Sequence, residues 1–126
     1  MRMGTVFGAV VLLLAACAKP EPLPPMTLSA AHVRTVQDGL RRGLKDPDSA
    51  KFGPMVAGLG KTGVASVCGW VNAKNSYGGY SGMSPFLGVM DEGGLVFEAV
   101  SIGSDRNSSD VVRIMCNGKG LALPPV

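Results

Sequence analysis

The stretch VASVCGWVNAK, from Val64 to Lys74, decides the fold of this 126-residue chain. Residues of two kinds alternate along it, and a period of two is the pattern of a β-strand whose faces differ. One face carries only small or apolar residues: Ala65, Val67, Gly69, Val71 and Ala73. The other face carries Ser66, Cys68, Trp70, Asn72 and Lys74. We therefore predict that this stretch is a strand of the central sheet.

Two further strands are predicted on the C-terminal side. Residues 85–91 and 95–102 are mostly apolar, and the DEGG sequence between them, residues 91–94, suits a hairpin turn. Residues 110–117 have two interpretations. We favour a short helix capped by Ser108 or Ser109, although the branched side chains of Val111, Val112 and Ile114 favour a strand.

A helix is predicted on the N-terminal side, between Thr27 and Lys45. Its apolar residues recur every three or four positions and so share one face: Val33, Val36, Leu40 and Leu44. Gly39 and Gly43 are poor helix formers, and we expect them to allow a close approach to the sheet. The sequence thus predicts one α+β domain over residues 27–126, with this helix packed on a small antiparallel sheet of three or four strands.

The first sixteen residues have the features of an export signal. Arg2 precedes the apolar run VFGAVVLLLAA, residues 6–16. At about 1.5 Å per residue, a helix of this length is too short to cross a hydrocarbon core of roughly 30 Å. A basic head, a short apolar run and small residues at its end are typical of a secretory signal peptide, so we expect residues 1–16 to be removed.

The end of this run, Leu14-Ala15-Ala16-Cys17, resembles the lipobox of bacterial lipoproteins. The resemblance implies a diacylglycerol on the Cys17 sulfur and acylation of the new amino terminus, which together give stable membrane anchoring. No Asp follows Cys17, which in this family favours the outer membrane, with the domain facing the periplasm. Residues 17–26 would then be the lipidated cysteine and a proline-rich tether, extended enough to hold the domain roughly 30 Å from the lipid.

Cys68 and Cys116 are the two cysteines that remain once Cys17 carries lipid. Because an exported chain meets an oxidising compartment, we predict that they form a disulfide. The competing interpretation is two free thiols or a metal pair. His32 is the only histidine and the ligand spacings of metal sites are absent, so we expect no metal and no cofactor.

The stretch CGWVNAKNSYGGYSG, residues 68–82, also has two interpretations. As structure it is a strand followed by a turn, because Asn75 and Ser76 tolerate turn geometry and Gly78-Gly79 supply positive φ. As function it is a binding loop, because amides and tyrosine faces suit a sugar or peptide ligand. The residues that would bind are Asn72, Lys74, Asn75, Tyr77 and Tyr80.

A second resemblance rests on two motifs. The first is D-P-x-S-A-x-F at residues 46–52, and the second is C-G-x-V-N-x-K-N-x-x-G-G-Y-x-G at residues 68–82. Together they resemble small proteobacterial envelope lipoproteins of unknown function. The resemblance therefore implies a family and a compartment, and it implies no activity.

The residue inventory argues against an enzyme. No serine or thiol motif accompanies His32, and no phosphate-binding glycine loop is present. A net charge of +3 is too small to indicate nucleic acid, and an exported protein does not meet it. We expect a non-catalytic binding or assembly module that is anchored in the membrane and engages an envelope protein or the cell wall. Alternatives are an inhibitor of a host or rival hydrolase and a small degenerate enzyme.

Overall fold

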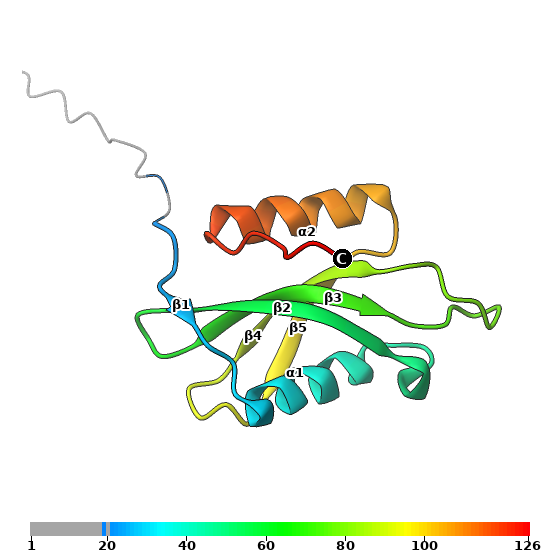
Figure 1. Ribbon diagram of the computed structural model, residues 1–126, viewed down its shortest axis with the longest axis horizontal. Helices are drawn as coiled ribbons and strands as arrows, with labels where there is room; N and C mark the ends of the chain where they lie inside the picture. The colour runs from blue at the N-terminus through cyan, green and yellow to red at the C-terminus, as the bar shows by residue number, and fades with distance from the viewer. Residues whose placement is uncertain (1–18, 20) are drawn as a thin grey trace, which may run out of the picture.

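The computed structural model describes Lys19 and residues 21–126 (Figure 1). Its five strands form one antiparallel sheet in the order β1-β2-β3-β4-β5. They are β1 (Pro25–Met26), β2 (Lys51–Leu59), β3 (Ala65–Asn72), β4 (Ser84–Met90) and β5 (Phe97–Ile102). The helices are α1 (Ala30–Arg42) and α2 (Arg106–Gly118), with a short 3-10 turn, η1 (Pro47–Ser49), after α1. The predicted α+β class is confirmed.

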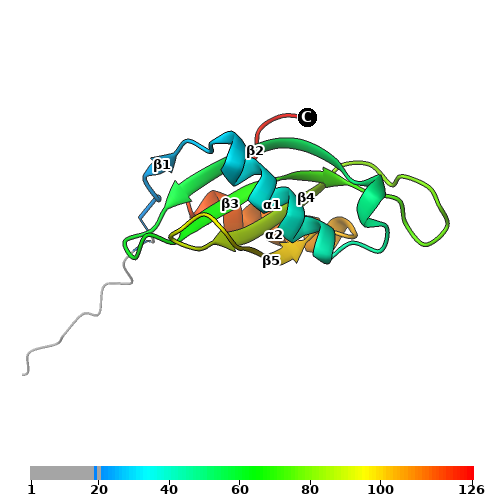
Figure 2. The same cartoon turned by 90° about the horizontal axis from the view of Figure 1, so that it is seen from below.

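The two helices cover opposite faces of the sheet. Figure 1 shows α2 and the C-terminal tail on one side of the strands and α1 on the other, and Figure 2 shows α1 in front of the strands. Within the described residues, no helix has the length and apolar character needed to cross a membrane.

The face of β3 that the sequence predicts to be apolar lies against α1. Ala65, Val67 and Val71 belong to a buried cluster with residues of α1 and of the neighbouring strands: Val36, Leu40, Ala57, Phe86, Met90 and Phe97. Gly39 lies directly on Phe97, and a Cβ at Gly39 would stand 2.6 Å from the Phe97 ring. The expected close approach is therefore confirmed for Gly39. It is wrong for Gly43, which caps the helix and would place a Cβ no nearer than 3.6 Å to any atom considered.

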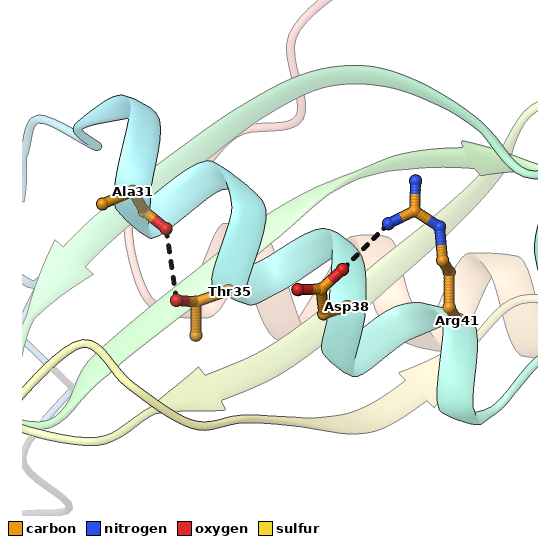
Figure 3. A network of polar contacts seen from close by, with 4 residues as sticks. All are labelled: Ala31, Thr35, Asp38 and Arg41. Atoms are coloured by element: carbon orange, nitrogen blue, oxygen red, sulfur yellow. Dashed lines mark hydrogen bonds and ion pairs between the residues drawn. The ribbon is translucent and has the colours of Figure 1, made fainter.

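The start of α1 shows why the helix begins at Ala30. Ser29 accepts a hydrogen bond from the His32 backbone, and the His32 ring accepts one from the Ser29 backbone, so each satisfies a free donor of the first turn. The Thr35 hydroxyl donates a hydrogen bond to the Gly94 carbonyl oxygen at 2.8 Å and lies 3.2 Å from the Ala31 carbonyl oxygen. One turn further on, Arg41 pairs with Asp38 at 2.9 Å (Figure 3).

The opposite face of the sheet carries the disulfide. Cys68 of β3 and Cys116 of α2 are bonded, as predicted, and both are fully buried. They lie in a second apolar cluster with Leu87, Val112 and Leu121. Val112 and Cys116 are four residues apart and share the inner side of α2, so the helical interpretation of residues 110–117 is the one confirmed. The helix begins earlier than predicted because Asp105, not Ser108 or Ser109, is its N-cap.

The predicted number of strands, three or four, is wrong. β2 was missed because Gly53, Pro54 and Gly58 interrupt its pattern. Pro54 lies inside a bulge, between Phe52 and Met55, where the ladder is already broken and a missing N–H costs little. β1 is two residues long and comes from the proline-rich segment, which no local pattern marks as a strand.

The proline-rich segment lies against the domain from Leu23 onward. The Leu23 backbone donates a hydrogen bond to the Lys119 carbonyl at 2.9 Å, and Leu59 donates one to Pro24 at 2.9 Å. These residues are part of the folded body, which differs from the expected free spacer of roughly 30 Å. The predicted signal peptide, the lipobox and Cys17 lie outside the described residues.

Candidate binding loop

The loop between β3 and β4, residues 73–83, projects from one end of the sheet. Figures 1 and 2 both show it at the end of the molecule opposite to β1. It holds four of the five predicted binding residues, Lys74, Asn75, Tyr77 and Tyr80, while Asn72 is the last residue of β3.

Ser49 of η1 holds the base of this loop. Its hydroxyl accepts a hydrogen bond from the Lys74 backbone at 2.9 Å and donates one to the Asp46 carbonyl at 2.8 Å. Its own carbonyl accepts a hydrogen bond from the Tyr80 hydroxyl at 2.8 Å. Lys74 and Tyr80 also form an isolated bridge across the loop. The two sequence motifs, which are distant in the chain, therefore meet here.

Asn75 has a structural task. Its side-chain oxygen accepts hydrogen bonds from the backbone N–H groups of Tyr77, at 3.0 Å, and Gly79, at 3.2 Å. Its own backbone pairs with Gly79 at 2.9 Å, and Gly78 adopts a φ of 79° to close the turn. The Asn75 side-chain oxygen therefore stabilises the turn. The group that Asn75 can still offer to a ligand is mainly its amide nitrogen.

The two tyrosines of the loop differ in their surroundings. Tyr80 is 40% exposed, and the ammonium groups of Lys51 and Lys74 lie 4.5 and 5.8 Å from its ring centroid. Both are within range of a cation–π attraction, so Tyr80 is fixed at its ring and at its hydroxyl. Tyr77 is 96% exposed at the tip of the loop. Tyr77 is thus the most exposed of the large apolar side chains of this loop, ahead of Tyr80 and of Met83, which is 39% exposed.

Asn72 is placed in the sheet rather than in the loop. It pairs with Lys51 across the ladder between β2 and β3. Its side-chain oxygen is buried and has no hydrogen-bond partner within the described part of the chain. Such a group is uncommon in a folded protein, and it makes Asn72 a poor candidate for direct contact with a ligand from solvent.

A hollow of about 360 Å³ lies beside the loop. It is bounded by the ends of α1, β3 and β5 and includes Lys74 and Asn75 in its wall. Lys45, also in the wall, donates a hydrogen bond to the Ser76 hydroxyl at 2.9 Å and so ties the loop to the end of α1. Asn72, Tyr77 and Tyr80 do not line it, so the predicted binding residues do not converge on one cavity.

Three lysines surround the base of the loop and give it a basic character: Lys45, Lys51 and Lys74. The sequence prediction included only Lys74. Ser49 was quoted within a motif but was not predicted to touch the loop, because the contact joins residues 25 and 31 positions apart. The arrangement offers ammonium groups and tyrosine faces to a partner.

A larger hollow, of about 690 Å³, lies at the free edge of β2. Its wall is mainly apolar, and its polar side chains are Thr27 and Gln37. None of the predicted binding residues and none of the three lysines line this hollow. We therefore take the basic loop, and not the larger hollow, as the candidate site.

A metal site needs several ligating side chains close together. No group of three or more metal-binding side chains occurs among the described residues. His32 is used in the helix cap and its ring lies against Gly94, so its role is structural. Comparisons with known protein families, with curated proteins and with solved structures find no significant match to this chain.

Proposed function

We propose that this protein is a lipid-anchored, non-catalytic binding or assembly module of the bacterial envelope. Its partner would be an envelope protein or the cell wall, engaged through the loop that carries Tyr77. The observation that carries the proposal is the contrast within this loop. Its base is held by Ser49 and Tyr80, while Tyr77 at its tip is almost fully exposed.

An ordered loop with an open aromatic ring is suited to binding. Loops on a rigid scaffold carry much of the binding by proteins, and a loop ordered in advance loses less entropy when its partner docks. Tyr77 is the residue of the loop best suited to contact a partner, because its ring offers a large contact area with few rotatable bonds.

The lysines at the base of the loop suggest the chemistry of the partner. Lys51 and Lys74 flank the Tyr80 ring, and Lys45 reaches the loop from the end of α1. Ammonium groups beside tyrosine faces suit anionic groups on a sugar or peptide, because the charges complement each other and the rings stack.

The anchor is proposed from the lipobox that ends at Cys17. It would place the module at the outer membrane, facing the periplasm. Mass spectrometry of the protein purified from membranes tests this part directly. We expect an acylated Cys17 as the first residue, and a mature chain with a free amino terminus and no lipid would refute it.

Photo-crosslinking in cells tests the binding loop. A photoreactive residue at position 77 should capture a defined partner, whereas one at Leu95, exposed in the turn between β4 and β5, should not capture the same partner. Tyr77→Ala should abolish capture by affinity purification and leave the melting temperature unchanged, because Tyr77 makes little contact with the fold. Leu95→Ala is the matched control. Unchanged capture by Tyr77→Ala would refute the loop as the site.

The identity of the captured partner decides between the binding module and its first alternative. A hydrolase held with the loop in its cleft, and inhibited by the purified domain, would favour the inhibitor. An exposed tyrosine at the tip of a projecting loop is the feature that supports that alternative.

A further inference from the structure

We infer that α2 lies on the surface of a lipid bilayer, with its outer side among the headgroups. The inference rests on the proposed lipid anchor at Cys17. It goes beyond the proposed anchor because it assigns one face of the domain to the membrane. A lipid on a long free tether would leave the orientation of the domain undetermined.

The first step is the length of the connection. Between Cys17 and Leu23 the sequence has five residues, 18–22. Six Cα–Cα steps of about 3.6 Å each span at most about 22 Å. From Leu23 onward the chain is held by the hydrogen bonds to Lys119 and Leu59. The anchor therefore lies close to the point where the chain leaves the domain.

The second step is where that point lies. Leu23 is bonded to Lys119, the residue that caps the end of α2. Pro22 packs closely against Gly120, since a Cβ at Gly120 would stand 2.6 Å from Pro22. In Figure 1 the described start of the chain stands level with α2, at the C-terminal end of that helix. The anchor is thus attached beside α2, on the side of the sheet that α2 covers.

The third step is the outer surface of α2. Its inner side is occupied by Val112 and Cys116, yet three more apolar side chains are exposed at helical spacing: Val111 (52%), Ile114 (70%) and Met115 (37%). No described element covers them. A short helix with exposed aliphatic side chains next to a lipid anchor is suited to the boundary between headgroups and acyl chains.

The charges on α2 agree with this placement. Arg113 and Lys119 lie in the half of the helix nearest the anchor, whereas the far end carries two acidic residues, Asp105 and Asp110, and one basic residue, Arg106. The Arg113 guanidinium lies 5.0 Å from the Trp70 ring centroid, so Lys119 is the cation nearest the anchor that is free of this contact. Cationic side chains close to the surface are attracted by anionic phospholipids, which strengthens the contact. The bilayer is therefore the occupant we assign, and a mixture of zwitterionic and anionic phospholipids is its natural form.

The chain offers two matched probes, since it has only two isoleucines, Ile102 and Ile114. Ile114 is on the outer side of α2, and Ile102 packs against the cluster beneath α1, on the other side of the sheet. The acylated full chain, with labelled isoleucine and leucine methyl groups, is placed in nanodiscs of phosphatidylethanolamine and phosphatidylglycerol. A spin label is then carried by the lipid headgroups.

We expect the spin label to remove the Ile114 methyl signal and to leave the Ile102 signal at the intensity seen with unlabelled lipid. Intact mass of the same sample reports whether Cys17 carries lipid, so failure of the anchor is detected separately. With lipid present, equal loss of both signals, or loss of neither, would overturn the inference. Loss of the Leu95 methyl signal without loss of the Ile114 signal would also overturn the inference. Leu95 is 81% exposed in the β4–β5 turn, and its contact with the headgroups would mean that the domain stands on its end.

A second copy of the chain is the other possible cover for α2. Cys17→Ser gives an unlipidated protein that can be studied without a bilayer. We expect its Ile114 signal to be independent of protein concentration. A shift of that signal with concentration, together with a dimer in sedimentation, would assign the outer side of α2 to self-association and overturn the membrane contact.

Discussion

At the residue scale, the packing of α1 depends on the two glycines that enclose Phe97. The Phe97 ring is fully buried and meets the Phe86 ring edge to face, with centroids 6.1 Å apart. Gly39 lies over it from α1, and Gly88 lies against it from β4. A side chain at Gly39 would occupy space that the Phe97 ring and the Phe97 carbonyl already fill, and one at Gly88 would meet the Phe97 ring and the Glu98 carbonyl. The helix therefore approaches the sheet more closely than a longer residue would permit.

Replacing Gly39 with alanine should lower the free energy of unfolding. Forcing extra volume into a packed core costs about 1–3 kcal/mol, which exceeds the roughly 1 kcal/mol that alanine gains in helix propensity. Gly118→Ala is the control, because a Cβ there meets nothing within 4 Å, and we expect a gain of about 0.5–1 kcal/mol. Urea denaturation measures both. Equal stability of Gly39→Ala and the wild type would contradict the close contact.

Ser49 makes a second prediction at this scale. Ser49→Ala removes the acceptor of the Lys74 N–H and should cost about 1 kcal/mol, as for one hydrogen bond. The larger effect is local, since amide protons of residues 74–80 should exchange faster while those of β3 do not. Hydrogen exchange followed by NMR measures this. Ser81→Ala, an exposed serine of the same loop, should leave exchange unchanged.

At the element scale, α2 is the element whose attachment depends most on one covalent bond. It meets the sheet through Val112 and Cys116, while much of its remaining surface is exposed. The disulfide to Cys68 spans 48 residues of chain, so it restricts the unfolded state strongly.

Removing this disulfide should destabilise the whole domain. The Cys68→Ala/Cys116→Ala variant is expected to lose about 4 kcal/mol in the chain-entropy account of a loop of this size. Reduction of the wild type should give a similar loss, and reductant should not affect the variant. Guanidinium denaturation with and without reductant measures the effect. Wild-type stability in the variant would contradict the prediction.

Two turns hold their geometry through carboxylates. The Asp91 carboxylate accepts hydrogen bonds from the Val96 and Leu95 backbones, which lowers the pKa of Asp91 below its ordinary 3.8. The Ser108 backbone and hydroxyl likewise lower the pKa of Asp105, at the start of α2. In both cases the folded state favours the ionised form more than the unfolded state does.

Stability should therefore fall in acid. The contribution of each carboxylate is fully present above its ordinary pKa of 3.8 and is lost as the pH falls through the lower pKa of the folded state. We expect the urea midpoint to fall between about pH 4 and pH 2. The variant Asp91→Asn/Asp105→Asn should show a flatter dependence over this range, and a slope equal to that of the wild type would contradict the assignment.

At the scale of the whole molecule, the described start of the chain and the candidate loop are at opposite ends of the sheet. The chain enters beside β1, and the loop with Tyr77 projects from the far end (Figures 1 and 2). β3 alone, with eight residues at about 3.3 Å each, spans on the order of 26 Å between these ends. A partner at the loop would therefore be held clear of the proposed anchor.

The proposed anchor predicts a change in location. Cys17→Ser should move the protein from the membrane fraction to the soluble fraction of cells, because it removes the lipid on which the proposed anchoring depends. The Cys68→Ala/Cys116→Ala variant is the control and should remain with the membrane. Fractionation and immunoblotting measure both. Membrane retention of Cys17→Ser would show that another part of the chain holds it.

The sequence by itself determined the elements whose signal is local. The alternation in residues 65–72 set the two faces of β3, and the spacing of Val36 and Leu40 set the inner face of α1. The pairing of Cys68 with Cys116 was predicted from the expected export of the chain and from the two cysteines left once Cys17 is assigned to the lipid, and the disulfide is confirmed. In each case the signal is a repeating pattern of apolar residues or the chemistry of one residue type, and it does not depend on which distant segments pack nearby.

Only the tertiary structure decided the edge of the sheet and the base of the loop. Pro54 and two glycines hid β2, because their effect on a strand depends on whether they fall at an edge or in a bulge. β1 exists only because β2 offers it a free edge, and Ser49 reaches Lys74 and Tyr80 only after η1 and β3 are side by side. Such contacts join segments distant in the chain, and their geometry is fixed by packing rather than by any local pattern.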